Sequence, residues 1–213
     1  ATTWAAWDED DQIGDFGDPD DTHYREGVYV GYRFYDSVGK EPLLPFGFGM
    51  GYTTFDVQIR QVSLDCARVS IDVDVTNIGG YPGKETIQVY ASVPAGRLDQ
   101  PLQALAGFTK TDEIAPGATA RITVDVDLTD LTSYDEASHA TILEAGRYLL
   151  RAGTSSRQLS PVAVVELAQD ATVRHLAGDL GEPGFTDRKP EVPAVLDIPA
   201  GLPVLTVDPA DLR

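Results

Sequence analysis

The chain has 213 residues, with 34 acidic against 16 basic side chains and a formal net charge of −18. This charge argues against nucleic acid or an anionic membrane as a partner, because both attract clustered Lys and Arg. The hydrophobic fraction of 42% predicts a folded core, while no apolar run approaches the roughly 18 residues of a membrane helix.

Residues 1–22 form an acidic segment that contains no basic side chain. Like charges broken by Gly14, Gly17 and Pro19 favour an exposed loop. A calcium loop is the alternative, but Ile13 stands where the turn glycine of an EF-hand belongs. The acidic residues are Asp8, Glu9, Asp10, Asp11, Asp15, Asp18, Asp20 and Asp21.

Residues 23–56 are dense in aromatic residues and glycine, without strand or helix periodicity. Such a segment is typical of an arm that packs its rings between domains, while glycines allow tight turns. A sugar-binding face is the alternative, since sugar rings stack on aromatic rings. The candidate domain-docking residues are Tyr24, Tyr29, Tyr32, Phe34, Tyr35, Phe46 and Phe48.

Residues 57–168 show the alternation of apolar and polar residues that predicts β-strands. It is clearest in residues 69–76, where Val and Ile alternate with Ser, Asp and Thr. Short strands with one polar face, separated by turns and without a long helix, indicate an all-β antiparallel β-sandwich. The expected strands are residues 57–64, 69–76, 87–90, 122–128, 146–152 and 162–167.

Residues 169–213 are expected to form a Pro-rich C-terminal linker. Residues 171–180 are compatible with a short helical turn, and Pro190, Pro193, Pro199 and Pro203 keep the following chain extended. The chain begins without Met and runs well past the last predicted strand, so we expect it to be a fragment of a longer protein.

Catalytic motifs are absent: the sequence contains no Gly-x-Ser-x-Gly, Walker loop or His-Glu-x-x-His. His23, His139 and His175 are far apart in sequence, which favours scattered surface histidines over a metal site. Cys66 is the single cysteine, and no base is close to it in sequence, which favours a packing or incidental thiol over a nucleophile.

The carboxylates of the predicted strands do not form an evident catalytic pair. Asp72, Asp74, Asp125 and Asp127 are expected on polar strand faces, where they keep the sheet soluble. We therefore predict no catalytic residue, no metal site and no cofactor in this chain.

Several ordered motifs resemble the fibronectin type III-like domain of glycoside hydrolase family 3 β-glucosidases, with its flanking segments. YREGVYVGYR at 24–33 and EPLLPFGFGMGYTTF at 41–55 resemble the segment that leaves the family's α/β sandwich domain. The first residues are similar to that domain's last strand. Within the predicted sandwich, the motifs are VTNIG at 75–79, GKETIQVY at 83–90, PLQALAGF at 101–108, DLTDLTSYD at 127–135 and GRYLLRAGTSS at 146–156.

The resemblance implies an immunoglobulin-like sandwich with extended arms that acts as a non-catalytic structural domain. Its parent enzyme would hydrolyse terminal β-linked sugars by a retaining two-carboxylate mechanism, with both carboxylates in other domains. The implied partners are a (β/α)8 barrel, an α/β sandwich domain and the parent's β-glycoside substrate. The tail resembles the start of a connection to a following barrel. A single cysteine and the lack of an N-terminal leader in this chain favour a cytoplasmic compartment.

A carbohydrate-binding or adhesion module is the alternative function. It would require an exposed row of aromatic rings on the sandwich itself rather than on the arm. The aromatic residues there are Tyr81, Tyr90, Phe108, Tyr134 and Tyr148, with no Trp among them, which makes this alternative the weaker one.

Overall fold

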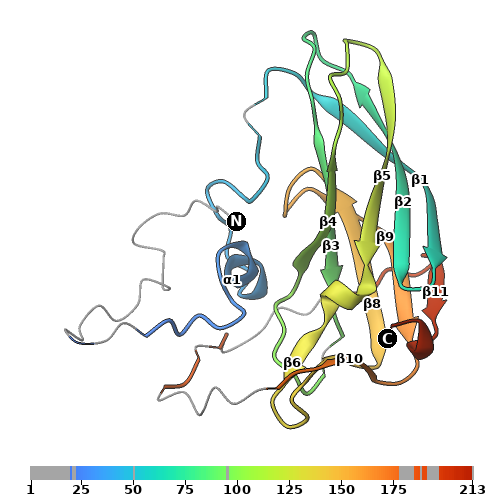
Figure 1. The fold of residues 1–213 in the computed structure, drawn as a ribbon. Coiled ribbons are helices and arrows are strands. Elements are labelled where there is room, and N and C mark those ends of the chain that lie inside the picture. Colours follow the sequence, from blue (N-terminus) through green and yellow to red (C-terminus); the bar gives the residue numbers. More distant parts are fainter. Residues whose placement is uncertain are drawn as a thin grey trace.

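The computed structural model describes most of the chain and is dominated by strands, which confirms the all-β fold (Figure 1). The strands are β1 (Phe55–Asp65), β2 (Arg68–Asn77), β3 (Thr86–Ser92), β4 (Ala104–Lys110), β5 (Thr119–Asp127), β6 (Ser133–Asp135), β7 (Ala140–Leu143), β8 (Gly146–Gly153), β9 (Leu159–Leu167), β10 (Ala171–His175) and β11 (Val204–Val207). The helices are α1 (Tyr32–Ser37), η2 (Leu128–Leu131) and η3 (Pro209–Leu212). The described residues are 20, 23–49, 51–94, 96–177, 185–187, 189–190 and 197–212.

Two sheets face each other to form the predicted sandwich. One sheet has the order β1-β2-β5 and the other β11-β9-β8-β3-β4, while β10-β7-β6 forms a small third sheet. Strands β1, β2 and β5 pair antiparallel, as do β9, β8, β3 and β4 in the second sheet.

The described helices are all too short to span a membrane.

The core lies between the two large sheets and follows the alternation of the sequence. Val69, Ile71, Val73 and Val75 on β2 have no solvent exposure. They pack in one cluster with residues of the second sheet, including Val89 on β3. The polar residues between them point to the opposite face of the three-stranded sheet, as the period of two requires.

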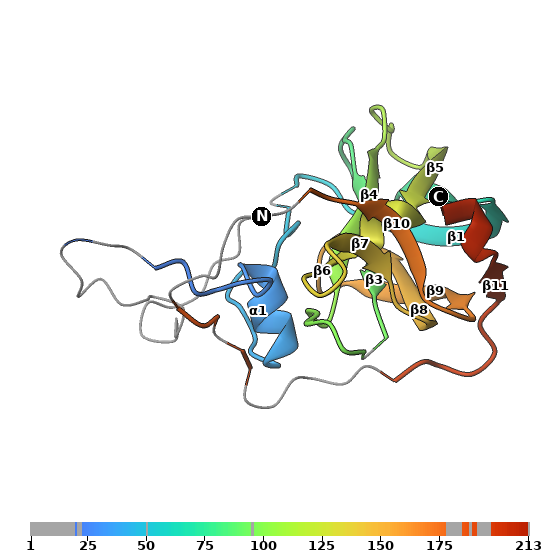
Figure 2. The ribbon, with the colours of Figure 1, turned by 60° about the horizontal axis from the view of Figure 1, so that its bottom comes forward.

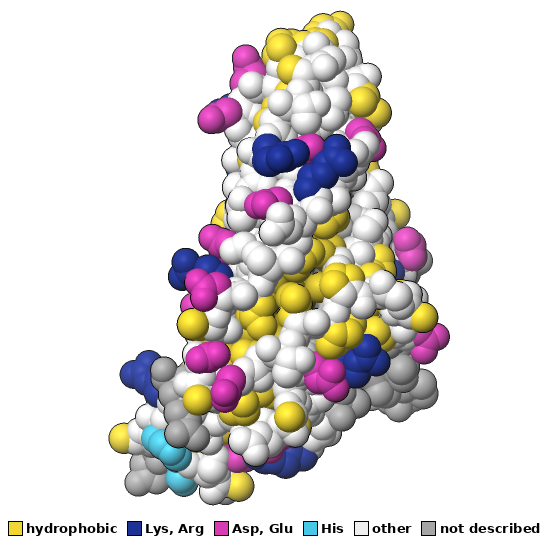
Figure 3. Space-filling view, turned by 90° about the vertical axis from the view of Figure 1, so that its right-hand side faces the viewer, with side chains coloured by type: hydrophobic (Ala, Val, Ile, Leu, Met, Phe, Trp, Pro, Cys, Tyr) yellow, Lys and Arg dark blue, Asp and Glu magenta, His cyan; other side chains and the backbone are white. Residues whose placement is uncertain are grey.

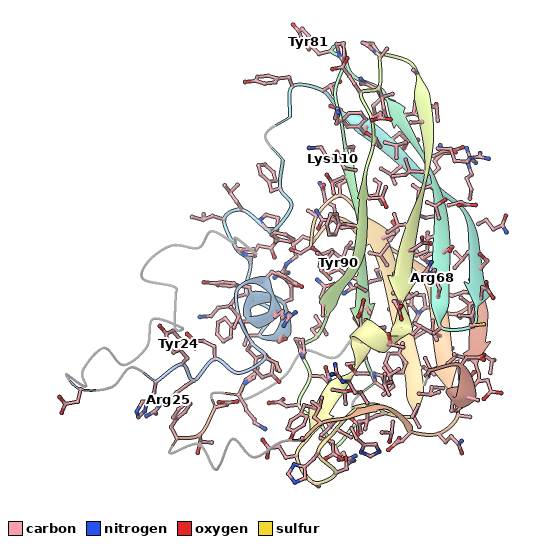
Figure 4. The ribbon with its side chains drawn as sticks, in the orientation of Figure 1. Tyr24, Arg25, Arg68, Tyr81, Tyr90 and Lys110 are labelled. Atoms are coloured by element: carbon pink, nitrogen blue, oxygen red, sulfur yellow. The ribbon has the colours of Figure 1, made fainter. Side chains whose placement is uncertain are left out.

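Asn77 organises one end of the sandwich from a fully buried position. Its Nδ2 donates to the carbonyl oxygens of Tyr81 (2.7 Å) and Ile114 (2.8 Å). Its Oδ1 accepts from Thr53 Oγ1 (2.6 Å) and the Gly79 amide (3.0 Å). One side chain thus satisfies four groups from three segments and fixes the end of the sandwich that carries Tyr81 (Figure 4).

The C-terminal region takes part in the fold more than the sequence indicated. The predicted helical turn in residues 171–180 is wrong for its first half, because Ala171–His175 is strand β10, paired with β7. Strand β11 pairs in parallel with β9, and Val207 and Leu212 are buried against the core. Figure 2 shows η3 beside β1, so this end of the chain closes the edge of the sandwich.

Asp74 corrects the expectation that strand carboxylates only keep the sheet soluble. Its side chain is buried between Arg60, whose Nε lies 2.7 Å from one carboxylate oxygen, and Arg121, whose Nε lies 2.6 Å from the other. Asp72 and Asp125, by contrast, accept hydrogen bonds from Thr123 and Ser70 at exposed positions. Basic and acidic side chains lie next to one another on the side of the molecule turned away from α1 (Figure 3).

We predict that Asp74→Asn removes an acid-sensitive contribution to stability. Hydrogen bonds from Arg121 and Arg60 lower the pKa of Asp74 from 3.8 to about 2. A lowered folded-state pKa stabilises the protein above the unfolded-state pKa, and this stabilisation is lost as pH falls toward the folded-state value. In urea unfolding between neutral pH and about pH 2, the difference between wild type and variant should shrink with acidification. An Asp72→Asn control that shrinks equally would contradict the prediction.

We predict that Leu212→Ala destabilises the whole sandwich. The Leu212 side chain is 1% exposed and belongs to the main core cluster, so its truncation should cost about 2–4 kcal/mol of unfolding free energy. Val204→Ala is the matched control, because that side chain is 47% exposed on the adjoining strand. Equal unfolding midpoints for Leu212→Ala and wild type in urea would show that the C-terminal segment does not support the core.

Candidate functional site

The aromatic arm lies against the outer face of the five-stranded sheet (Figures 1 and 2). Its only helix in the described part of the chain is the six-residue α1, which follows Gly31, where φ is 60°. This left-handed conformation favours glycine, and it turns the chain onto the sheet. The Tyr32 ring stacks on Phe46 and meets Tyr90 of β3 edge-to-face, with centroids 5.6 Å apart in both pairs.

A buried polar network fixes α1 to the sheet. Asp36 is 3% exposed; one carboxylate oxygen accepts from Gln103 Nε2 (2.6 Å), and the other lies 2.8 Å from Arg157 Nε. Gln103 is 2% exposed; it also donates to the Ser156 carbonyl (2.8 Å) and accepts from Arg151. The side chains of Asp36, Gln103, Arg151 and Arg157 therefore each have at least one partner from another segment, although the buried Arg151 Nε donates no hydrogen bond within the described part of the chain.

Burial dominates the electrostatics of this network. Burial raises the pKa of Asp36, while the Gln103 hydrogen bond and the positive charges of Arg157 and Arg151 oppose that rise. Burial also lowers the pKa of Arg151, and the Asp36 carboxylate counteracts part of that change. The two charged forms thus support each other in a site where either alone would be costly.

Backbone contacts extend the attachment along the arm. Ser37 Oγ accepts from the Leu102 amide (2.9 Å), and Arg157 Nη2 donates to the Lys40 carbonyl (2.5 Å). The Phe46 carbonyl accepts from the Ser156 amide (2.8 Å). At Gly47, a Cβ atom would collide with the Gln88 amide, so only glycine allows this close approach.

The candidate docking aromatics divide into two groups. Tyr29, Tyr32 and Tyr35 are buried within this chain, and the Tyr29 hydroxyl donates to Asp99 (2.6 Å). Tyr24 and Phe48 are 78% and 54% exposed, and Figure 4 shows Tyr24 on the side of the arm away from the sheets. Phe34 and Phe46 are intermediate. The first group attaches the arm to its own sandwich, so only the exposed residues of the predicted set face outward.

Two exposed aliphatic side chains on the arm escaped the sequence analysis. Val30 is 58% and Leu43 is 67% exposed. Both lie next to buried or partly buried residues in sequence, and only the fold reveals which neighbour points outward. We call the exposed residues Tyr24, Val30, Leu43 and Phe48 the arm surface; the exposed Tyr52, three residues before β1, is not part of it.

Of the three histidines, His139 and His175 come close together, because His175 pairs with Ala140, the residue after His139. His23 stacks on Phe185 (4.8 Å between centroids), whereas His139 accepts a backbone hydrogen bond from Leu176, the residue after His175. Within the described ranges, no group of three His, Cys, Asp or Glu side chains could hold a metal ion. The residues of the acidic segment considered for calcium lie outside the described residues, apart from Asp20.

Cys66 lies at the tip of the β1–β2 hairpin with a φ of 52° and is exposed. The negative charges of Asp211 and Asp65 raise the pKa of its thiol. Because the thiolate is the nucleophile, this environment disfavours the reactive form.

The aromatic residues of the sandwich do not form one exposed set. Tyr90 and Tyr148 are buried, whereas Tyr81, Phe108 and Tyr134 are 66%, 67% and 43% exposed. The exposed rings belong to the loop after β2, to β4 and to β6, respectively. Any carbohydrate contact on the sandwich would therefore depend on individual rings.

Comparisons with known proteins agree with this architecture. The model of the fibronectin type III-like domain matches residues 85–156. The chain is 36% identical over 162 residues to β-glucosidase A of Butyrivibrio fibrisolvens. The aligned region covers 66% of this chain and 20% of that protein.

Solved structures of β-glucosidases are also similar to this chain. The β-glucosidase of Paenibacillus barengoltzii superposes with a TM-score of 0.78 at 32% identity, covering 83% of this chain and 21% of that one. The GH3 β-glucosidase of Bifidobacterium adolescentis gives a TM-score of 0.62 at 32% identity, covering 73% and 23%. The chain therefore spans about a fifth of the length of these relatives.

We predict that Arg157→Met releases the arm while the sandwich stays folded. The change leaves the buried Asp36 carboxylate without its ion-pair partner, which costs about 3 kcal/mol locally. The amides of Val38 and Lys40, which donate to Phe34 and Tyr35, should then exchange hydrogen about 100-fold faster, while β2 amides keep their protection.

Two further variants control this experiment. Arg147→Met removes an exposed arginine from β8 and should leave arm exchange unchanged. Adding Asp36→Asn to Arg157→Met should restore part of the protection, because the unpaired buried charge is removed. Unchanged exchange in Arg157→Met would show that the ion pair does not hold the arm.

Proposed function

Because the chain belongs to glycoside hydrolase family 3 and carries the fibronectin type III-like domain of its β-glucosidase-type members, we propose that it is a non-catalytic structural domain of such an enzyme. Its role is to hold the catalytic domains of the parent protein at a fixed spacing. The active site then lies in those other domains, and the carboxylates of this chain serve structure and solubility.

The observation that carries this proposal is the two-sided arm. One set of arm residues is buried against the sheet, and the arm surface of Tyr24, Val30, Leu43 and Phe48 is exposed. Exposed apolar side chains on a firmly attached segment are typical of a protein–protein contact. A rigid arm with a free apolar side is what a domain clamp requires.

The proposed partners are the (β/α)8 barrel and the α/β sandwich domain of the parent enzyme. This chain spans about a fifth of its relatives' length, which leaves room for both domains. In retaining glycoside hydrolysis, two carboxylates about 5 Å apart act on one bond, so small errors in domain spacing lower the rate. On this basis we propose that the parent hydrolyses terminal β-linked sugars.

We predict that the arm surface is needed when this chain replaces its counterpart in the Paenibacillus barengoltzii β-glucosidase. The chimera should hydrolyse an aryl β-glucoside, and Leu43→Ser with Phe48→Ser should lower its kcat/KM by roughly tenfold or more, because two apolar contacts are lost. The same double variant in the isolated chain should unfold at an unchanged urea concentration, since both side chains are exposed there.

Tyr81→Ser is the matched control, because Tyr81 is equally exposed but lies at the end of the sandwich away from α1 (Figure 4). This variant should keep the activity of the chimera. Equal losses from the arm and Tyr81 variants, or no loss from either, would contradict docking through the arm surface.

A further inference from the structure

A groove of about 400 Å³ lies between the arm, the loop that joins β3 to β4, and the segment from η2 to β6. The apolar residues Ala91, Val93, Ala104 and Leu105, where β3 ends and β4 begins, line it, and we call them its floor. This volume falls within the range of small-molecule sites in proteins, roughly 300–1,000 Å³. The rest of the lining is Val28, Arg33, Leu98, Asp99, Gln100, Pro101, Asp130, Leu131, Thr132, Ser133 and Tyr134.

The rim of the groove offers hydrogen-bonding side chains and one aromatic ring. Arg33 comes from the arm, and Asp130 and Tyr134 come from the opposite wall. Within the described part of the chain, the side chains of Arg33 and Asp130 have no hydrogen-bond or ion-pair partner. The Tyr134 ring is 43% exposed. An apolar floor with such a rim suits a ligand that has both C–H faces and hydroxyl groups.

The loop wall of the groove is fixed in place before any ligand binds. Arg97 donates to both carboxylate oxygens of Asp135, at 2.8 and 3.0 Å. The Glu144 carboxylate accepts from the amides of Arg97 (2.8 Å) and Leu98 (3.2 Å). Tyr29 donates to Asp99, which completes the connection to the arm. Such preorganisation lowers the ordering cost of binding.

Three main-chain amides beside the groove are already occupied. The Leu98 amide donates to Glu144, the Leu102 amide to Ser37 Oγ and the Leu105 amide to the Tyr32 hydroxyl. An extended peptide binds beside a sheet mainly through such backbone groups. These three amides are not available to a strand-like peptide, which favours a saccharide held by side chains.

The charges at the rim nearly cancel, although the chain as a whole carries a charge of −18. Arg33 and Asp130 have opposite charges, and Asp99 pairs with Lys189 at 3.2 Å. An acidic ligand would find no excess positive charge here, and a basic one no excess negative charge. This balance favours a neutral ligand.

We propose that this groove binds a short neutral oligosaccharide. Sugar C–H faces would contact the aliphatic floor and the Tyr134 ring, while Arg33 and Asp130 would bond to hydroxyl groups. The site uses none of the arm-surface residues, so it goes beyond the clamp function and does not depend on it.

The test is a titration of the isotope-labelled chain followed by amide NMR shifts. The probes are cellotetraose, xylotetraose and laminaritetraose, with tetragalacturonate as an acidic probe and a neutral Ser-Val hexapeptide as an extended peptide. We expect at least one neutral tetrasaccharide to shift amides in residues 98–100 and 130–134. Tyr134→Ala and Asp130→Asn should each weaken that binding roughly tenfold.

Tyr81→Ala is the matched control and should leave the affinity within about twofold, because Tyr81 is an exposed aromatic at a distant position. Spectra of all variants away from the groove should match wild type, which shows that they fold. The proposal is overturned if no neutral tetrasaccharide shifts groove amides at about 10 mM, or if only the peptide or tetragalacturonate does. It is also overturned if the groove variants bind as wild type does.

Discussion

Burying the Asp36 carboxylate beneath α1 is costly, and the chain offsets that cost with Gln103, Arg157 and Arg151. Gln103 directly precedes β4, Arg157 lies in the turn before β9 and Arg151 belongs to β8. The carboxylate therefore joins the arm to three parts of the fold. Such a buried pair contributes less to net stability than apolar packing would, but its geometry admits few alternatives. We infer that it sets where the arm lies, while Tyr32, Phe46 and Tyr90 supply most of the attraction.

The position of the arm in turn determines what the molecule presents to its surroundings. With Tyr29, Tyr32 and Tyr35 turned inward, residues between and beyond them, such as Val30 and Leu43, are left facing solvent. A flexible arm could bury these residues against itself, but an arm attached along its length cannot. The exposure of the arm surface is therefore a consequence of the buried polar network around Asp36.

The sandwich could be predicted from sequence because its core follows a local rule. Residues 69–76 alternate strictly, and β2 has its apolar side chains fully buried. The roles of Asp36, Asp74 and β11 could not be predicted in this way, since each depends on partners distant in sequence. Asp74 resembles its neighbour Asp72 in sequence context, yet two arginines from other strands enclose it. Likewise, Val204–Val207 becomes a strand only because the edge of β9 is available for pairing.

The contacts that attach the arm to the sandwich also link it to the groove. Gln103, which bonds to Asp36, directly precedes the floor residues Ala104 and Leu105, and the Tyr32 hydroxyl occupies the Leu105 amide. Tyr29 reaches the loop wall through Asp99, a residue that lines the groove. A displacement of the arm would therefore remove one wall of the groove and free a backbone donor on its floor. Since Glu144 and the Arg97–Asp135 pair hold the remaining wall independently of the arm, the groove would open on one side rather than collapse.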